Sequence, residues 1–463
     1  MFTDTYYRRR FMQLGFGSLG GLALNHLNAA EGKPRHHQAK ARSVILCYMS
    51  GGVSHVDSFD PKPLLKKLHG KSMPGEILRT QFDNNGKIMQ SPWESKKYGQ
   101  SGLEMTNLFP HIAGCADDIA LVRGMTAKFS EHAQGNFYMH TGFPFLGSPS
   151  AGAWVNYGLG SVNQNLPGYV VLNNKTGIPH GGKSIFGSGF LPATTGASFF
   201  NLDQDEVVSR VKPSRPLKEQ RASLEFLEQL DGAFAKRSAA EGEVQSAIKN
   251  YETAFRMQSA VPELMNLDKE PAYLKREYGF EHKDPLVAGY GQQCMVARRL
   301  VEKGVRFVEL SCSNFKGDGQ RPNPWDQHGN LPHGHQEMAR QVDQPIAALI
   351  NDLKQRGLLE STLIIFTGEF GRTPFSQGNN GRDHNPYGFS LWMAGGGIKG
   401  GSVHGATDDL GYHATEDKTT VYDLWATVLH QLGMDHEKLT FRYGGRDMRL
   451  TDVHGNVMRS ILH

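Results

Sequence analysis

The chain has 463 residues, and 50 basic against 46 acidic residues give it a net charge of only +4 at pH 7. That length can bury a large core, and one α/β domain with insertions fits it as well as two domains. A small charge excess without a basic run interleaved with aromatic residues argues against nucleic acid as a partner. The 4 cysteines are spaced neither as zinc-ligand pairs nor as a disulfide framework.

The amino-terminal segment is typical of an export signal. The run RRRFM at residues 8–12 matches the twin-arginine pattern, residues 14–27 are weakly apolar, and residues 28–30 suit a cleavage point. We expect a signal peptide at 1–30, a polar linker at 31–42, and delivery by the twin-arginine translocase to the periplasm or cell surface. No other apolar run reaches the roughly 20 residues that span a bilayer, so no membrane span is expected after cleavage.

The rest of the chain, residues 43–463, alternates between short apolar runs and amphipathic segments. This pattern predicts one α/β domain with a mostly parallel central sheet and helices on both faces. The expected strands are 43–49, 119–123, 169–172, 305–310 and 363–366. The expected helices are 108–115, 148–160, 335–357 and 420–432.

Residues 213–279 are rich in charged residues and helix formers. Their apolar positions recur at helical spacing, as at Leu224, Phe226, Leu227 and Leu230. We expect a helical insertion that packs beside the sheet.

Polar residues whose side chains can bind a metal or act in catalysis follow the apolar strand at 363–366. Glu369 and Arg372 come directly after it, and Asp383 and His384 precede the next apolar run. Because ligands gather just past the carboxyl ends of strands in open α/β sheets, these residues predict a catalytic or metal site. The guanidinium of Arg372 suits a phosphate or sulfate oxyanion, and the alternative is a salt bridge to a ligand carboxylate.

Two further loops carry imidazole and carboxylate groups together. Asp326 and His328 precede a long amphipathic helix, and His55 and Asp57 follow the turn after the first strand. Imidazole with carboxylate oxygens suits a divalent cation such as zinc or manganese, with calcium as a further option. The alternatives are an ordinary polar loop for the first pair, and turn capping with amide binding for the second.

Six segments carry a resemblance to known proteins. They are GGVSHVDSFDPKP (51–63), GSPSAGAWVNYGLG (147–160), WDQHGN (325–330), GEFGRTP (368–374), GRDHNP (381–386) and GGRDMRLTDVHG (444–455). The order strand, WDQHGN, helix, TLIIFTGEFG, then DH before a strand ending in GGG resembles the alkaline phosphatase-like superfamily, which includes sulfatases and cofactor-independent phosphoglycerate mutases. More closely, nearly the whole mature chain is similar to an uncharacterised family of exported, sulfatase-like bacterial proteins, a domain of unknown function.

This resemblance implies a metal site whose ligands come from loops at strand ends. Asp326 and His328 take the position of an Asp-and-His pair that binds one metal, and His384 matches the later histidine of the same metal. Glu369 stands where the superfamily has an Asp, whereas Phe370 stands where many relatives have His.

The first strand and the nucleophile position depart from the superfamily pattern. Relatives end the first strand in a metal-binding Asp, so His55 or Asp57 would have to substitute for it. The nucleophile position falls on His132, with Ser130 and Thr126 as alternatives and a role as metal ligand also open to His132. No Cys or Ser has the sulfatase Cys-x-Pro-x-Arg context, so formylglycine chemistry is not expected.

The resemblance implies an exported, metal-dependent hydrolase of phosphate or sulfate esters. The expected substrate is a small-molecule or polysaccharide ester. The alternative is a catalytically degenerate member that binds anionic glycans or partner proteins at the cell surface.

Overall fold

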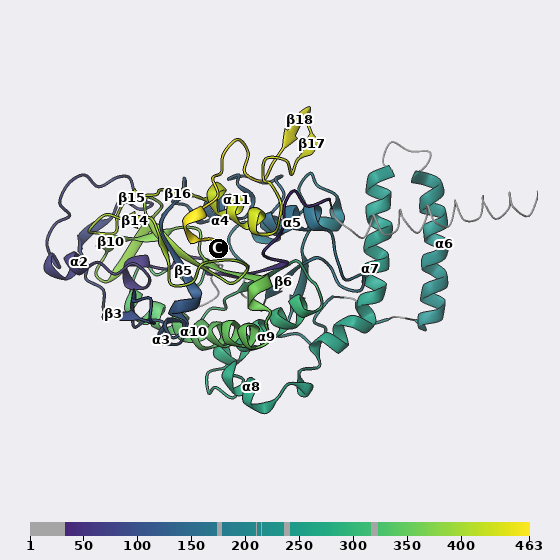
Figure 1. Ribbon diagram of the computed structural model, residues 1–463, viewed down its shortest axis with the longest axis horizontal. Coiled ribbons are helices and arrows are strands. Elements are labelled where there is room, and N and C mark those ends of the chain that lie inside the picture. Colours follow the sequence, from purple (N-terminus) through teal and green to yellow (C-terminus); the bar gives the residue numbers. More distant parts are fainter. Residues whose placement is uncertain (1–32, 174–177, 210, 214, 236–240, 316–322) are drawn as a thin grey trace, which may run out of the picture.

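The computed structural model describes residues 33–463 except 174–177, 210, 214, 236–240 and 316–322 (Figure 1). The expected signal peptide at 1–30 lies outside the described residues. The described end of the expected linker is tied to the domain, because the amides of Lys40 and Ala41 donate to the carbonyl of Gln431. Among the described helices, none is both long enough and apolar enough to cross a membrane.

The core element is a nine-stranded sheet in the order β13-β5-β12-β9-β1-β8-β6-β7, with β16 paired to β5. Strands β7, β6, β8, β1 and β9 run parallel, whereas β12 is antiparallel to both β5 and β9. The expectation of a mostly parallel sheet is therefore confirmed. The strands are β1 Ser43–Tyr48, β5 Ile119–Thr126, β6 Tyr169–Asn173, β7 Ser198–Asn201, β8 Phe307–Ser311, β9 Thr362–Thr367, β12 Phe389–Ala394, β13 Val403–His404 and β16 Thr419–Thr420.

Helices cover both faces of this sheet, and Figure 1 shows them as two layers. Ile45 and Cys47 of β1 belong to the apolar cluster that includes residues of α9 and α10. Leu46 and Tyr48 belong to the opposite cluster, which includes residues of α4, α5 and α11. The alternation follows from the period of two along a strand. The helices are α3 Pro110–Ala113, α4 His132–Thr141, α5 Ala151–Leu159, α9 Pro285–Glu302, α10 Leu331–Gln355 and α11 Val421–Gln431.

A second, three-stranded sheet lies beyond the ends of β1 and β9. Its order is β11-β10-β2, all antiparallel, with Arg372 of β10 opposite His384 of β11. The sequence did not predict this hairpin, which places Arg372, Asp383 and His384 on strands instead of in loops at the main sheet's edge. The bounds are β2 Asn85–Ile88, β10 Gly371–Gln377 and β11 Gly381–Asn385.

Smaller elements complete the domain. They are the short helix α2 Pro63–Lys67 and three two-stranded ribbons, β3 Ser95–Tyr98 with β4 Leu103–Thr106, β14 Ala406–Thr407 with β15 Ala414–Glu416, and β17 Phe441–Tyr443 with β18 Arg446–Met448.

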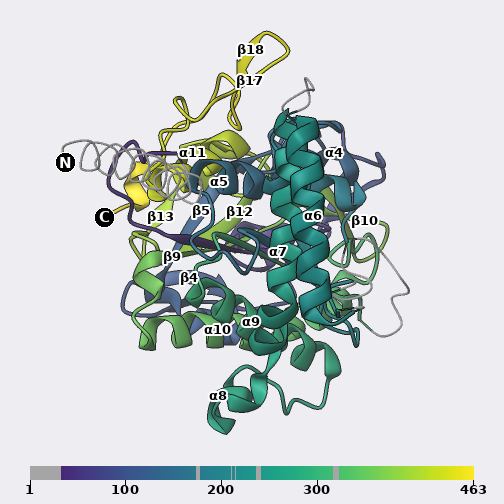
Figure 2. The same cartoon turned by 90° about the vertical axis from the view of Figure 1, so that its right-hand side faces the viewer.

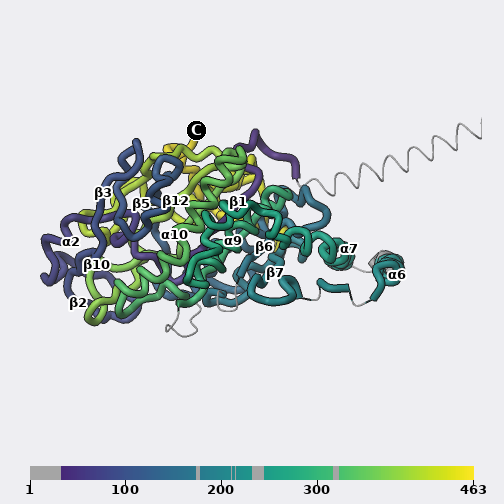
Figure 3. The backbone as a smooth tube through the Cα atoms, turned by 90° about the horizontal axis from the view of Figure 1, so that it is seen from below, coloured from purple at the N-terminus to yellow at the C-terminus, as the bar shows by residue number. Residues whose placement is uncertain are grey.

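A helical hairpin projects from one end of the molecule. Figures 2 and 3 show α6 (Leu217–Ala235) beside α7 (Glu241–Met265), with α6 outermost. Buried Met257, Val261 and Leu264 of α7 join the core, and α8 (Ala272–Glu277) follows. The insertion was expected to pack beside the sheet; α6 packs on α7, and α7 in turn packs on α9.

Candidate metal centre

Four side chains converge beyond the carboxyl end of β9: His132, Asp326, His328 and His384. Each offers one donor atom, and these four atoms all lie within 4.8 Å of one another. His132 begins α4, His384 lies in β11, and Asp326 and His328 precede α10. The sequence predicted that three of them bind one metal, and it left open that His132 is a ligand instead of a nucleophile.

A close approach of two loops brings Asp326 into place. Gly51 follows β1 with φ +111°, and a Cβ on it would lie 2.5 Å from the backbone nitrogen of Asp326. The amide of Trp325 donates to the carbonyl of Ser50 at 3.1 Å. Glycine is therefore required here both for its backbone conformation and for the contact.

Two of the histidines are oriented through their Nδ1 atoms by groups that only accept hydrogen bonds. Nδ1 of His132 lies 2.7 Å from Oε1 of Glu369, and Nδ1 of His384 is bonded to the carbonyl oxygen of Ser130. Because a carboxylate and a carbonyl cannot donate, each Nδ1 carries the hydrogen. In the neutral ring, Nε2 is then the nitrogen with the free lone pair.

His328 repeats the pattern, since its Nδ1 is bonded to Oε1 of Gln377 in β10. All three Nε2 atoms face the carboxylate of Asp326, at 3.2 Å for His132, 2.8 Å for His328 and 3.2 Å for His384. Nε2 of His132 and Nε2 of His328 are buried and make no hydrogen bond of acceptable geometry. Lone pairs that point at a carboxylate repel it unless positive charge lies between them.

This arrangement fits a divalent cation. Metal-binding histidines characteristically donate their second ring nitrogen to a carboxylate, a carbonyl or a similar acceptor, which fixes the tautomer and the ring. Three imidazole nitrogens and one carboxylate oxygen also match the donor types and the number that zinc prefers. The contacts of these four residues therefore fit a bound divalent cation.

The charges around the cluster set the protonation states. Burial alone raises the pKa of Asp326, but Arg372 and the facing histidines bring it far below its ordinary value. Burial and the charge of Arg372 lower the pKa of His384. Burial alone would lower the pKa of His132 as well, but Asp326 and Glu369 on its two sides raise it to about 9. The carboxylates thus attract a cation to the point where the rings meet.

Glu369 and Arg372 contact members of the cluster but do not belong to the four donor residues. The carboxylate of Glu369 accepts from the amide of Gly51 at 2.8 and 3.0 Å and from His132, so it orients a ligand instead of joining the four donors. Arg372 is fully buried and pairs with Asp326 at 2.6 Å. Its guanidinium also donates to backbone carbonyls, those of Gly51, Gly52 and Arg382. The expectation that Arg372 meets a substrate oxyanion is corrected to the alternative, a salt bridge with a ligand carboxylate.

His55, Asp57 and Asp383 were predicted as metal ligands, but the structure does not bring them into the cluster. Asp57 is fully buried and pairs with Arg382 at 2.7 and 3.1 Å. Nε2 of His55 lies 2.6 Å from the carbonyl oxygen of Gly411. Both residues are committed to fixing the loop after β1.

Asp383 turns away from its neighbour His384. Its carboxylate accepts from the amide of His384 at 2.8 Å and from the amide of Phe82 at 3.2 Å. Period-two alternation along β11 explains the difference, because adjacent side chains of a strand point to opposite faces. Only His384 can face Asp326.

A polar stripe on α4 was missed by the sequence analysis. His132, Asn136 and His140 are spaced four residues apart, so they lie on one helix face. Asn136 accepts from the hydroxyl of Tyr48 at 2.6 Å, and Nε2 of His140 lies 2.8 Å from Oε1 of Glu309. The three polar side chains dock the helix across the ends of β9, β1 and β8. Their spacing was the available signal.

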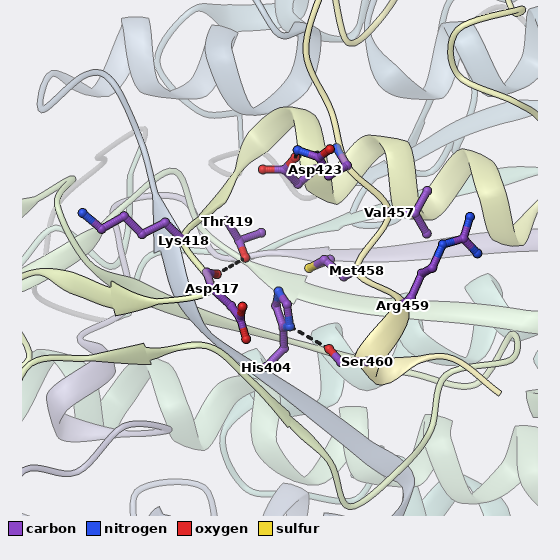
Figure 4. A pocket seen from close by; sticks show the side chains of 10 residues that line it. His404, Asp417, Lys418, Thr419, Asp423, Val457, Met458, Arg459 and Ser460 are labelled. Atoms are coloured by element: carbon purple, nitrogen blue, oxygen red, sulfur yellow. Dashed lines mark hydrogen bonds between the residues drawn. The ribbon is translucent and has the colours of Figure 1, made fainter.

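A separate pocket of about 300 Å³ does not contain the four donors (Figure 4). His404, Asp417, Asp423 and Arg459 are among the residues that line it. Nδ1 of His404 is bonded to the hydroxyl of Ser460, and Asp423 caps α11. We assign the chemistry to the cluster of His132, Asp326, His328 and His384, because four metal-binding donor types converge there.

Comparisons with known proteins give one family and several distant structures. No curated protein matches the chain. Among solved structures, the PsFucS1 sulfatase from Pseudoalteromonas sp. shares 14% identity, over 89% of this chain and 70% of that chain, with a TM-score of 0.37. The lipoteichoic acid synthase LtaP from Listeria monocytogenes shares 9%, over 93% and 80%, with a TM-score of 0.39.

The phosphonate monoester hydrolase SpPMH from Silicibacter pomeroyi shares 12% identity, over 86% of this chain and 73% of that chain, with a TM-score of 0.36. These identities and TM-scores are too low to transfer an activity. A family model, in contrast, matches residues 41–462. The chain therefore belongs to the family described as Protein of unknown function (DUF1501).

Proposed function

We propose that the protein is an exported, metal-dependent hydrolase of phosphate or sulfate esters. The observation that carries the proposal is the convergence of three Nε2 atoms on the carboxylate of Asp326, with each Nδ1 held by an acceptor. A single neutral histidine in a polar loop has many structural explanations. Three histidines that are each held at Nδ1 and face one carboxylate with Nε2 have one economical explanation, which is a bound cation.

His132, Asp326, His328 and His384 would hold this cation. When bound, a divalent cation supplies Lewis-acid polarisation of a phosphoryl or sulfuryl oxygen. The predominance of imidazole favours zinc over manganese, and it argues against calcium, which takes six to eight oxygen ligands. The buried Arg372 keeps Asp326 ionised.

The roles of the expected nucleophiles follow from their contacts. His132 is engaged at Nδ1 by Glu369 and faces Asp326 with Nε2, so we assign it to holding the cation instead of attacking the ester. Ser130 presents its carbonyl to His384, and its hydroxyl lies 3.5 Å from Oε1 of Gln81. The carbonyl of Ser130 therefore orients His384, and the hydroxyl of Ser130 lies on the same segment.

An exposed aromatic ring lies beside the cluster. Phe82 is 56% exposed, and its ring stands edge-on to His328 at 4.7 Å and to His384 at 6.2 Å between centroids. An exposed apolar side chain next to polar donors suits the non-reacting part of an ester, such as a sugar ring or an aryl group.

A binder without turnover is the second candidate, and the contacts of Arg372 favour it. Phosphate and sulfate chemistry commonly uses a guanidinium on the ester oxygens, but that of Arg372 is taken up by Asp326 and by backbone carbonyls. A site that keeps its cation but lacks this group would bind anionic glycans or proteins more readily than it would cleave them.

Metal analysis followed by assay separates the two. Protein purified without chelator is analysed for bound metal, reconstituted with zinc or manganese, and given aryl phosphates and aryl sulfates. Turnover that disappears in His384→Ala but persists in His333→Ala supports the hydrolase, since His333 is an exposed histidine of α10 that is not one of the four donor residues. A metal-loaded protein that binds anionic glycans and cleaves none of these esters would support the binder. Absence of bound metal under all these conditions would contradict both.

A further inference from the structure

A fifth histidine, His180, lies beside the metal centre but is not one of its four donor residues. It is exposed, and its ring centroid lies 5.8 Å from that of His132. The chain turns sharply directly after it, because Gly181 has φ +101°. A Cβ on Gly181 would lie 3.1 Å from the ring of Phe137 in α4, so this segment lies close against the helix. His180 is therefore held next to the helix that begins with His132.

Two buried side-chain amides hold the backbone of His180. Nδ2 of Asn136 donates to the carbonyl of His180 at 3.1 Å, and the amide of His180 donates to Oδ1 of Asn323 at 3.3 Å. The two asparagines are only 0% and 2% exposed. Asn136 lies on the same face of α4 as His132, and the carbonyl of Asn323 accepts from the amide of Asp326 at 3.1 Å. Two segments that carry donor residues of the metal centre therefore also fix an exposed histidine.

The same contacts fix the tautomer of the His180 ring. A backbone amide can only donate, so the atom of the Asn323 side chain that faces the amide of His180 is the oxygen. The nitrogen of that side chain, Nδ2, then lies 3.0 Å from Nδ1 of His180 and donates to it. Because Nδ1 accepts, the hydrogen of the neutral ring is on Nε2. This tautomer is the reverse of the one in His132, whose Nδ1 faces the carboxylate of Glu369.

The reversed tautomer gives His180 a different chemical role from that of His132. Nε2 of His132 offers a bound cation a lone pair, whereas Nε2 of His180 carries a hydrogen and donates. No residue in the part of the chain that the structure describes accepts a hydrogen bond from this nitrogen. A fixed donor without a partner, next to a site for a cation, suits an anion that is bound at that cation.

We propose that His180 donates a hydrogen bond from Nε2 to an oxygen of the phosphate or sulfate group that is held at the cation. This role rests on the proposed function, because it needs both the cation and a tetrahedral oxyanion. A metal–oxygen contact of about 2.0–2.2 Å and a hydrogen bond of about 2.9 Å, joined by the oxyanion, span the distance to a neighbouring ring. His180 then supplies the donor that Arg372 does not, since Arg372 pairs with Asp326.

The first test measures the binding of inorganic phosphate to the zinc-loaded full chain by titration calorimetry, with the bound zinc counted in every variant. His180→Ala should weaken phosphate binding about ten- to a hundredfold, because a hydrogen bond to a charged group is lost. Its zinc content should not change, because no ligand is removed. His69→Ala is the matched control and should bind phosphate like the wild type. His69 is an exposed histidine in the turn after α2, and its Nδ1 likewise accepts, from the amide of Gln90 at 3.3 Å.

The second test separates a donor at Nε2 from a histidine that only supports the fold. The amide nitrogen of a glutamine can take the place of Nε2, whereas that of the shorter asparagine reaches only the place of Nδ1. His180→Gln should therefore keep most of the phosphate affinity, and His180→Asn should lose it as His180→Ala does. Urea denaturation of the three variants shows that they are equally stable.

Failure of the proposed function and failure of the His180 role give different results. A wild-type protein that binds no zinc, or binds zinc but no phosphate, would remove the proposed function and the role of His180 with it. Zinc-dependent phosphate binding that His180→Ala leaves unchanged would overturn the role of His180 alone. Loss of zinc in His180→Ala would make His180 a ligand instead of a donor. Equal phosphate affinities of His180→Gln and His180→Asn would exclude a donor at Nε2.

Discussion

Two buried charged clusters lie side by side beyond the carboxyl ends of the central strands, and they differ in how their polar atoms are satisfied. In the first, the guanidinium of Arg382 binds both carboxylate oxygens of Asp57 and donates to the carbonyls of Thr373 and Met89. In the second, three imidazole nitrogens face the carboxylate of Asp326 without a full set of donors. Every charged group of the first cluster has partners within the chain, whereas in the second cluster Nε2 of His132 and Nε2 of His328 make no hydrogen bond of acceptable geometry.

This difference distinguishes charged residues that stabilise the fold from charged residues that bind a ligand. A satisfied ion pair is complete within the chain, so its contribution is to hold the loop after β1 against the β10-β11 hairpin. In the second cluster, buried ring nitrogens without a hydrogen-bond partner indicate a ligand that is not part of the chain. The residue types alone do not distinguish them, since both contain an aspartate beside a buried arginine.

The largest expected effect comes from removing a ligand of the second cluster. His384→Ala should abolish stable metal binding and lower ester hydrolysis roughly a thousandfold, because the Lewis-acid contribution to the transition state is worth several kcal/mol. Steady-state assays of the zinc-loaded and manganese-loaded protein measure this, with His333→Ala as the control. Equal metal content in His384→Ala and wild type would remove the contrast between the clusters.

The first cluster should respond in stability instead. Asp57→Ala leaves Arg382 charged and buried without its partner, so we expect the free energy of unfolding to fall by about 3–5 kcal/mol. Urea denaturation measures the loss. The double variant Asp57→Leu with Arg382→Met, which removes both charges, should recover much of it. A single variant as stable as wild type would show that the pair is not structural.

The sequence predicted much of this arrangement. Continuous apolar runs identified β1, β5, β6, β8 and β9, because strands buried on both faces are apolar at every position. Asp326, His328 and His384 were predicted as ligands of one metal, and they lie together. The apolar strand before the three glycines was expected, but its antiparallel direction and the β10-β11 hairpin were not, since a short buried polar strand such as GRDHN has no apolar alternation to identify it.

The roles of the residues that contact the four donor residues could not be predicted from the sequence. Glu369 was predicted as a ligand because it follows β9, but a carboxylate at that place can bind a metal or orient a histidine equally well. Whether Glu369 binds the metal or orients a histidine depends on the position of His132, which is distant in sequence. Likewise, nothing local distinguishes Asp57, which pairs with Arg382, from Asp326, which faces the histidines.

A smaller effect is expected at Glu369, which is not one of the four donors but orients one of them. Glu369→Gln removes the charge that orients His132 and should lower metal affinity about 10–100-fold, as losses of such outer partners typically do. A chelator competition titration measures the affinity. Glu309→Gln is the matched control, because Glu309 holds His140 on the same helix face but lies away from the cluster. Equal effects of the two variants would mean that the loss acts through α4 as a whole.

The smallest expected effect concerns His140 and depends on pH. Burial alone lowers the pKa of His140, but Glu309 outweighs it and raises the pKa above its ordinary value. A raised pKa in the folded state means that the protonated ring contributes stability below its unfolded pKa of about 6.5, and that this contribution is lost as the pH rises through the folded pKa.

His140→Gln should therefore cost about 1 kcal/mol at low pH and less as the pH rises, because a neutral amide keeps a hydrogen bond to Glu309 but not the charge. Urea denaturation of both proteins between about pH 6 and pH 9 measures the difference, and titration of His132 cancels because both proteins contain it. A difference independent of pH would show that His140 stays in one protonation state throughout. The Glu309 pair, on the far end of the stripe that carries His132, would then resemble the fixed Asp57 pair in being satisfied at every pH.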